Sequence, residues 1–357
     1  MDQELDAMGM LDLMVRPGFF VKENRIIKCN LAAQSLMLRP DMEITELLAT
    51  GREEYAEFTG GCLYLTLSVF GSVWGTSITR KGGFDVFILE QEADQSELRS
   101  MALAAKELRA PLSSVMTTAD RLFPMTALED DPDLREQVAR LNRGLYQMLR
   151  VIGNMSDAGQ FTAASSAMET TEISAFLEDI FARTGELAVH TGLSLRFRNL
   201  PQPLYCLADR EKLERAVLNI LSNAMKFTPA GGTIEAKLVR RGNRLILTVE
   251  DSGEGIGDQI RGSIHSRYLR SPGMEDPRFG IGLGMVLIRS AAAIHGGTVL
   301  IDHPEGTGTR ITMTMTIRQD TSGKVRSPRL RIDYAGERDH ALLELADILP
   351  ASLYENL

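Results

Sequence analysis

The stretch LNILSNAMKFT, residues 218–228, carries Asn219, Asn223 and Lys226 within a helical apolar pattern. Asn219 and Asn223 stand four residues apart, so both project from one face of a helix, and Lys226 follows on the same side. A neutral carboxamide oxygen suits magnesium, which keeps most of its waters and also binds nucleotide phosphates. A neighbouring lysine supplies a point charge for phosphate. Such residues also occur as ordinary solvated side chains, so the interpretation depends on the motifs that follow.

The second motif, VEDSGEGIG, spans residues 249–257 and ends an apolar strand at Asp251. A carboxylate fixed at a strand end can accept a hydrogen bond from an adenine amine. Gly253 and Gly255 let the backbone pass close to a planar base, because they have no side chain to obstruct it. Taken alone, the motif favours an acidic turn after an edge strand.

Two further glycine-containing motifs follow. GIGLGM, residues 280–285, opens a predicted helix, where backbone N–H groups bind phosphate and glycines permit close approach. It is not a Rossmann fingerprint, because no apolar strand precedes it, and it lacks the Gly-Lys-Ser/Thr of a Walker A loop. In GTGTRI, residues 306–311, Thr309 begins the last predicted strand, and its hydroxyl can reach a buried polar ligand edge.

Together and in this order, the four motifs resemble the Bergerat-type ATP-binding domain of histidine kinases, gyrase-type topoisomerases, Hsp90-type chaperones and mismatch-repair ATPases. The resemblance covers roughly residues 170–318 and implies that ATP and Mg²⁺ are the cofactors. It implies that Asn223 binds the magnesium, Lys226 a phosphate and Asp251 the adenine amine. The remaining implied nucleotide contacts are Asn219, Gly253, Gly255, Gly280, Gly282, Leu283, Gly284 and Thr309. Residues 256–279 would form a lid, in which IHSRYLR is similar to a degraded Phe-containing lid motif.

Position 219 separates the branches of this superfamily. The hydrolysing members carry a glutamate there to activate water, whereas Asn219 cannot serve as a general base. The resemblance is therefore to the histidine-kinase branch. The segment AKELRAPLSSV, residues 105–115, agrees, because it is similar to the histidine box of sensor histidine kinases, His-Glu-Leu-Arg-Thr/Asn-Pro-Leu.

Two departures from that box matter for catalysis. Lys106 occupies the position of the phospho-accepting histidine, and Ala110 that of the residue that orients water for the phosphatase reaction. A solvent-facing lysine is almost wholly protonated near neutral pH, and an ammonium group cannot attack a γ-phosphate. Glu107, the usual general base beside the acceptor, then has no evident proton to take. Lys106 can equally be a plain exposed residue.

The most regular periodicity lies in two segments that step alternately by three and four residues. The first seam comprises Leu98, Met101, Ala105, Leu108, Leu112, Val115, Ala119 and Leu122. After a break at residues 124–132, the second comprises Leu134, Val138, Leu141, Leu145, Met148, Ile152 and Met155. Such narrow apolar seams predict an antiparallel helical hairpin that pairs with a second copy as a four-helix bundle. The alternative is packing against the chain's own domains.

The first 89 residues read as a small α+β domain. The motif FFVKENRIIKCNLAAQSLM, residues 19–37, predicts a hairpin with its turn at residues 22–24, then a short helix over 31–38. Further strands are expected at 63–67 and 84–88, with a turn at 81–83 between them. This order resembles a PAS sensor fold; the alternative is an unspecialised α/β dimerisation module. A His-ligated haem is not expected, because no histidine precedes His190.

Composition excludes several classes of protein. Of 357 residues, 44% are hydrophobic and 24% charged, which is typical of a globular chain. The net charge of −9 argues against a general nucleic-acid surface. Cys29, Cys62 and Cys206 form no metal-ligand spacing or paired framework, which favours a reducing compartment. No apolar run approaches the length of a membrane span, and the acidic N-terminus lacks a signal-peptide start, so the expected location is cytoplasmic.

The predicted fold is α+β and multidomain, in four parts. These are a PAS-like domain (1–89), a dimerising hairpin (90–165), a histidine-kinase-type ATP-binding α/β sandwich (166–318), and a linker with a C-terminal helix (319–357). Within the sandwich, helices are expected at 174–191, 209–226 and 284–295, and strands at 193–197, 233–240, 244–251, 297–303 and 308–317. The tail contains strand-like RLRIDY and apolar HALLELADIL, which would otherwise expose its leucines and is expected to dock on a neighbour.

The predicted function is that of a dimeric, ATP-binding sensor-histidine-kinase homologue in two-component-type signalling that has lost autophosphorylation on its own hairpin. A response regulator or another signalling protein is the expected partner. One alternative is an active kinase that phosphorylates a partner or another residue of this chain, with His190, His265, His295, His303 and His340 as the available histidines. A second alternative is a scaffold with a vestigial nucleotide site.

Overall fold

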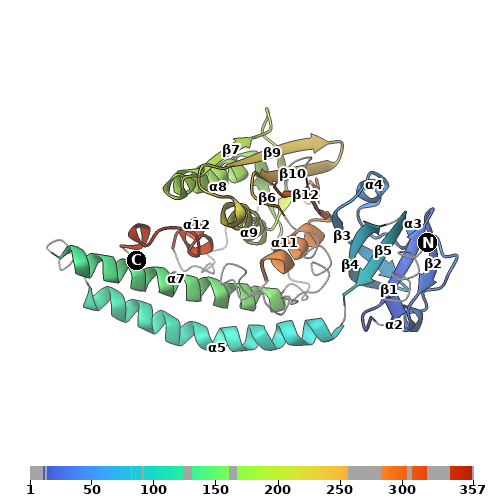
Figure 1. Cartoon of the computed structure of the whole chain (residues 1–357), viewed down its shortest axis with the longest axis horizontal. Helices are drawn as coiled ribbons and strands as arrows, with labels where there is room; N and C mark the ends of the chain where they lie inside the picture. The colour runs from blue at the N-terminus through green and yellow to red at the C-terminus, as the bar shows by residue number, and fades with distance from the viewer. Residues whose placement is uncertain are drawn as a thin grey trace.

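The computed structural model describes residues 11–12, 14–81, 83–90, 92–123, 131–160, 167–255, 283–303, 308–319 and 338–355. Figure 1 shows three parts: an N-terminal α/β unit at one end, a long helical hairpin along the base, and a second α/β unit above the hairpin. The second unit contains the residues from β6 to β12 and is called the C-terminal α/β unit below. Residues 338–355, the C-terminal segment, lie between that unit and the hairpin.

The N-terminal unit is a five-stranded antiparallel arrangement with three short helices. Its elements are β1 (Gly18–Lys22), β2 (Arg25–Cys29), α2 (Leu31–Ser35), α3 (Ile44–Leu47), α4 (Arg52–Ala56), β3 (Cys62–Val69), β4 (Ser72–Lys81) and β5 (Phe84–Leu89). Glu23 and Asn24 both have positive φ, at 49° and 68°, which suits the twist of a tight hairpin between β1 and β2. The hairpin predicted there is confirmed.

The buried side chain of Asn30, directly after β2, forms hydrogen bonds with backbone groups near the start of β1 and of α2. Its side-chain oxygen accepts hydrogen bonds from the backbone N–H groups of Gly18 (3.1 Å) and Ala33 (2.9 Å). The second bond caps α2, and the amide nitrogen donates to the carbonyl of Arg16 at 2.7 Å. One buried amide thereby joins the start of the first strand to the start of the first helix.

The predicted hairpin is confirmed as α5 (Glu92–Leu122) and α7 (Pro132–Gln160), which pack side by side. Only alternate members of each seam are buried within one chain. On α5 the buried members are Leu98, Ala105, Leu112 and Ala119, and on α7 they are Val138, Leu145 and Ile152. The intervening members Leu108, Val115, Leu122, Leu141 and Met148 are 42–66% exposed. The hairpin therefore keeps an uncovered apolar stripe in the described chain.

The C-terminal α/β unit lays helices on one face of a sheet (Figure 1). Its elements are β6 (Glu169–Glu172), α8 (Ile173–Ala188), η1 (Val189–Thr191), β7 (Ser194–Arg198), β8 (Tyr205–Ala208), α9 (Arg210–Phe227), β9 (Thr233–Arg241), β10 (Arg244–Asp251), α11 (Leu283–Ile294), β11 (Val299–Asp302) and β12 (Arg310–Thr316). Alternate residues of β10 are buried and the intervening ones half-buried, as expected for a sheet covered on one side. The strands and helices predicted for this region are confirmed within a few residues, while β6 and β8 were missed.

The two α/β units share one sheet, which the sequence did not predict. Ten strands run in the order β2-β1-β5-β4-β3-β11-β12-β10-β9-β7, and β3 of the N-terminal unit pairs antiparallel with β11. The pairing sets Leu63 opposite Leu300 and Cys62 opposite Ile301. A short edge strand of one unit thus finds its partner in the other, so backbone groups that would face solvent are hydrogen-bonded.

Several expectations need correction. The strand before the turn near Gly83 is β4, which was not predicted from the sequence. Helix α2 ends at Ser35, whereas the prediction extended it to residue 38. The apolar tail docks as predicted, but its helix is short. It comprises α12 (His340–Glu344) and a 3₁₀ turn, η3 (Ala351–Tyr354). The RLRIDY stretch lies outside the described residues.

A search of the described residues finds no helix with the length and apolar character needed to cross a bilayer.

Candidate functional site: polar residues on and beside helix α9

Helix α9 positions the first group of candidate residues. Its N-cap, Asp209, accepts a hydrogen bond from the backbone N–H of Lys212 at 3.3 Å, and its apolar face is buried against the sheet. Asn219 is 2% exposed, whereas Asn223 and Lys226 are half-buried on the last two turns. The helix thus carries these three polar side chains from a buried middle to a more open C-terminal end.

Asp251 ends β10 with its side chain on the buried side of the sheet, 8% exposed. Its Oδ1 accepts hydrogen bonds from the backbone N–H groups of Gly253 (2.9 Å) and Thr309 (3.2 Å). Burial raises the pKa of this carboxyl, although the two N–H donors oppose the shift. Thr309 directly precedes β12 and is 7% exposed. Its backbone hydrogen bond to Asp251 places it beside that carboxyl, as predicted.

Two glycines explain how these segments approach so closely. A Cβ on Gly253 would lie 2.3 Å from the carbonyl oxygen of Phe227, so the turn after Asp251 runs against the C-terminal end of α9. Gly308 has φ +99°, and a Cβ there would lie 1.8 Å from the carbonyl oxygen of Asp251. Side chains at either position would force the strand end, the turn and the helix apart.

The start of α11 closes the other side. A Cβ on Gly284 would lie 2.7 Å from Oδ1 of Asn219, so the first turn of α11 rests directly on that amide. Leu283 is 2% exposed and packs with Val286, Leu98 and Ala158, which joins this turn to both helices of the hairpin.

The structure therefore places most of the candidate residues on α9 or against it, and this group of residues is called the α9 site below. Asp251, Gly253 and Thr309 lie at the C-terminal end of α9, and Asn219 lies against Gly284 at the start of α11. Gly255, with φ +76°, is in the turn after Asp251, next to the ring of His303. Gly280, Gly282 and the proposed lid at 256–279 lie outside the described residues.

Lys106 and Glu107 are not part of the α9 site. Both are exposed on α5, and α7 lies between α5 and the C-terminal α/β unit (Figure 1). His295, by contrast, is a structural residue of the α/β unit. It is 3% exposed, and its Nε2 accepts from the backbone N–H of Asp209, while burial lowers the pKa of the imidazole.

Sequence reasoning missed a buried ion cluster one helical turn before Asn219. Arg215 is 1% exposed and contacts Asp157 and Asn154 of α7 as well as Glu344 of the C-terminal segment. The only sequence signal was an arginine four residues before Asn219, on the same helical face. Its partners are distant in the chain, so periodicity could not identify them.

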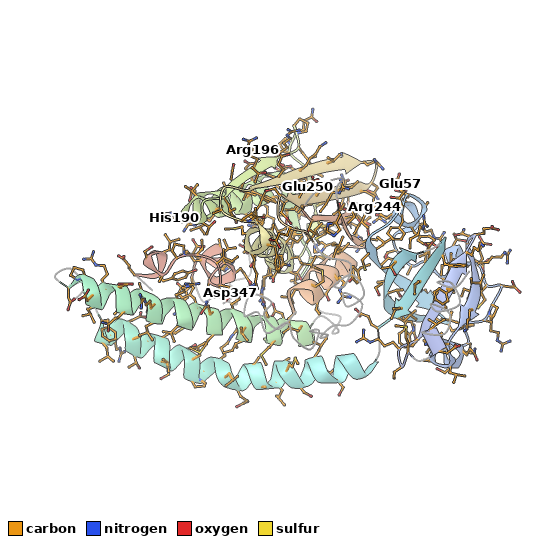
Figure 2. The ribbon with its side chains drawn as sticks, in the orientation of Figure 1. Glu57, His190, Arg196, Arg244, Glu250 and Asp347 are labelled. Carbon is orange, nitrogen blue, oxygen red and sulfur yellow. The ribbon has the colours of Figure 1, made fainter. Side chains whose placement is uncertain are left out.

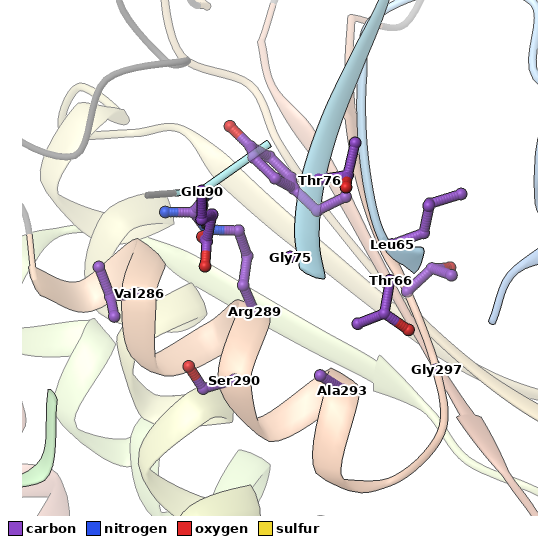
Figure 3. A pocket seen from close by; sticks show the side chains of 12 residues that line it. Leu65, Thr66, Gly75, Thr76, Glu90, Val286, Arg289, Ser290, Ala293 and Gly297 are labelled. Carbon is purple, nitrogen blue, oxygen red and sulfur yellow. Dashed lines mark ion pairs between the residues drawn. The ribbon is translucent and has the colours of Figure 1, made fainter. Parts of the chain in front are cut away.

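A second contact region joins the N-terminal unit to the C-terminal α/β unit. Glu54 binds Arg244 at 3.2 Å and Thr314 at 2.9 Å, and Glu57 pairs with Arg241; Figure 2 labels Glu57 and Arg244 at this junction. Beside it is a pocket (Figure 3), where the Arg289 guanidinium lies 4.4 Å from the Tyr64 ring centre. Arg289 also pairs with Glu90 at 3.4 Å, so the two units are connected by charges as well as by the shared sheet.

Comparison with known families identifies the C-terminal α/β unit. Residues 208–319 match the family described as histidine kinase-, DNA gyrase B-, and HSP90-like ATPase. Over these residues, the C-terminal α/β unit is similar to that family. The predicted resemblance to an ATP-binding domain is confirmed, and the C-terminal α/β unit is called the ATPase-family domain below. The matched residues include α9 and its asparagines, Asp251 and Thr309.

Curated proteins that are similar to this chain over two thirds or more of its length are named as histidine kinases. An uncharacterized sensor-like histidine kinase of Rhizobium meliloti is 28% identical over 276 residues, covering 72% of this chain and 52% of the relative. The signal transduction histidine-protein kinase/phosphatase MprB of Mycolicibacterium vanbaalenii is 29% identical over 250 residues, covering 67% of this chain and 50% of the relative. The chain thus spans about half the length of these two relatives.

Among solved structures, full-length ShkA in complex with AMPPNP is similar, with 22% identity and a TM-score of 0.49. The match covers 61% of this chain and 46% of ShkA.

Proposed function

We propose that this chain binds Mg-ATP at the α9 site and acts as a sensor-histidine-kinase-type protein in two-component signalling. The observation that carries the proposal is the arrangement of that site. A buried carboxylate, Asp251, lies at one end of α9, and Asn219, Asn223 and Lys226 project from the same helix. The α9 site thereby offers an acceptor for an adenine amine and polar groups for phosphates.

Each residue has a distinct task in this proposal. Asp251 accepts the adenine amine with the carboxylate oxygen that does not bind the backbone N–H groups, and Thr309 orders the same edge of the base. Lys226 attracts a phosphate. Asn223 would hold Mg²⁺ through its amide oxygen, and the bound ion would offset phosphate charge. The amide of Asn223 is half-buried, which suits an ion whose other ligands are waters and phosphate oxygens.

The proposed output differs from that of a kinase that phosphorylates its own hairpin. Helix α5 presents an exposed lysine, Lys106, where the family's histidine box has its acceptor. A protonated ammonium has no lone pair for attack on phosphorus. We therefore propose that nucleotide binding shifts the balance between conformations of the hairpin and the ATPase-family domain. The N-terminal unit, as a PAS-like sensor, would bias the same balance through the sheet that joins β3 to β11.

The uncovered stripe on the hairpin supports a homodimer. The exposed seam residues recur every seven positions, at Leu108, Val115 and Leu122 on α5, while the alternate set is covered inside the chain. A second hairpin is the complementary surface, because its own stripe has the same spacing and a four-helix bundle buries both.

Incubation with γ-labelled Mg-ATP tests the proposal. We expect binding by calorimetry but no acid-labile label on the wild-type chain. Lys106→His should introduce label, whereas Arg99→His, a matched exposed position one heptad earlier on α5, should not. Absence of Mg-ATP binding would overturn the nucleotide proposal and favour a scaffold. Stoichiometric label on the wild-type chain, or on an added response regulator, would instead establish an active kinase.

A further inference from the structure

The C-terminal segment contacts both the hairpin and the ATPase-family domain through a buried apolar surface. Leu343, Leu345, Ala346 and Leu349 are fully covered. Tyr354 packs edge-on against Tyr146 of α7, with ring centres 5.1 Å apart. The side chain of Asn142 on α7 donates to the Tyr354 carbonyl at 2.9 Å. This segment is therefore folded onto its neighbours and is not a loose tail.

At the centre of the segment is a carboxylate with no exposed surface. Glu344 is 0% exposed, and its two oxygens are bound from both sides. Arg150 of α7 approaches at 3.2 Å, and Arg215 of α9 at 3.3 Å. A buried carboxylate needs such partners, because burial without them is strongly unfavourable. Glu344 thus requires the hairpin and the ATPase-family domain to stay together.

Outer contacts extend the same bridge in both directions. On the hairpin side, Arg143 donates to the carbonyls of Ala346 (2.9 Å) and Asp347 (3.0 Å). Arg150 also pairs with Asp347, whose side chain is 35% exposed; Figure 2 labels Asp347 between the hairpin and the ATPase-family domain. On the domain side, His340 lies 2.9 Å from Glu214 of α9.

The bridge also reaches the α9 site. Nδ2 of Asn219 donates to Glu344 at 3.4 Å, and its Oδ1 faces Gly284. Asn219 is therefore held by the C-terminal segment on one side and contacts the start of α11 on the other. Any nucleotide-dependent movement of this amide changes the partners of Glu344.

From these contacts we propose that residues 338–355 are an intramolecular latch. The latch fixes the ATPase-family domain against the hairpin, and Glu344 is its central ion. Release of the latch precedes movement of the domain along the hairpin. The part of this proposal that concerns coupling to nucleotide rests on the proposed function; the latch itself does not. By thermodynamic reciprocity, a nucleotide that favours the released state binds more tightly when the latch is weakened.

Hydrogen exchange on the full-length chain tests the latch without nucleotide. Glu344→Gln keeps the shape of the side chain and removes its charge. We expect amides of residues 338–355 to exchange at least tenfold faster, with β9 and β10 unchanged. Glu355→Gln is the matched control, because it removes the same charge from the same segment without a described ion pair, and it should behave as wild type. Equal exchange in Glu344→Gln and wild type would overturn the latch.

A distance measurement tests whether the segment holds the domain in place. Spin labels at Thr117→Cys on α5 and Lys237→Cys on β9 occupy exposed sites, and the native cysteines are buried. Labelled chains are diluted with unlabelled ones so that only distances within a chain are recorded. We expect one narrow distribution in the wild-type background and a broader one with Glu344→Gln. Faster exchange with an unchanged distribution would refute the latch.

Two arms keep the outcomes distinct. If Glu344→Gln accelerates exchange throughout the ATPase-family domain, hydrogen exchange is measured on Asp347→Asn instead. This variant weakens only the outer pair between Arg150 and Asp347. A local increase in residues 338–355 supports the latch, and no increase overturns it. Mg-ATP is then added: tighter binding by Glu344→Gln, by a factor of about 3 to 10, supports the coupling to nucleotide, and equal affinity refutes that coupling. Absence of binding in every variant would refute the proposed function while leaving the exchange result intact.

Discussion

Replacement of Asp251 by asparagine separates nucleotide recognition from folding. Oδ1 of Asp251 accepts both backbone hydrogen bonds, from Gly253 and Thr309. Asparagine supplies an oxygen in the same position, so the turn keeps its internal bonds. Its amide nitrogen replaces the second carboxylate oxygen, and a donor would then face the adenine amine. Asp251→Asn should therefore leave the fold intact and weaken ATP binding.

The size of the effect follows from the loss of one charge-assisted hydrogen bond. Such a bond contributes about 1.5–3 kcal/mol, which corresponds to a rise in Kd of about 10-fold to 150-fold. Glu250→Gln is the matched control, because residue 250 lies on the opposite face of β10 and its 3.8 Å pair with Arg310 is partly exposed. Exposed pairs contribute about 0–1 kcal/mol, so its Kd for ATP should stay within about twofold of wild type.

Titration calorimetry at several pH values completes the test. Because burial raises the pKa of Asp251, the carboxylate becomes protonated at a higher pH than an exposed aspartate, whose pKa is about 3.9. The protonated group offers a donor, so wild-type affinity should fall as the pH drops through the raised pKa, and Asp251→Asn should lack this step. Wild-type affinity in Asp251→Asn, with an unchanged melting temperature, would refute the assignment of Asp251 to adenine.

Three further predictions concern stability and assembly. Gly308→Ala should lower the free energy of unfolding in urea by more than about 2 kcal/mol, because of backbone strain and a clash with the carbonyl of Asp251. The control Gly242→Ala, at φ +57° in open space, should lower it by about 1 kcal/mol. His295 is buried and its pKa is lowered, so it contributes stability above a pH of about 6.5. This stability is lost as the pH falls through the pKa of the folded state. His295→Gln should remove this pH-dependent loss from unfolding free energies measured in urea at several pH values. Val115→Glu should convert a dimer to a monomer by light scattering and Ser114→Glu should not, and a monomeric wild type would contradict the bundle.

The local elements of this protein were predictable from short-range patterns. Heptad spacing identified α5 and α7, and the alternation from Leu245 to Asp251 identified β10, because side-chain direction in helices and strands repeats with a fixed period. The order of the four motifs predicted the resemblance to an ATP-binding domain, and the structure places Asp251 and Thr309 of two of these motifs in contact. Each of these features depends on residues within one element or on a strand pairing that the family resemblance implies.

The relations between distant elements were decided only in the tertiary structure. The pairing of β3 with β11 uses backbone groups, which nearly every residue type carries, so no side-chain pattern predicted the shared sheet. No sequence pattern singled out Glu344, since a single carboxylate does not show whether arginines from α7 and α9 converge on it. The sequence thus determined most of the helices and strands and the resemblance to an ATP-binding domain, while the joined sheet and the buried bridge arose from contacts between residues far apart in the chain.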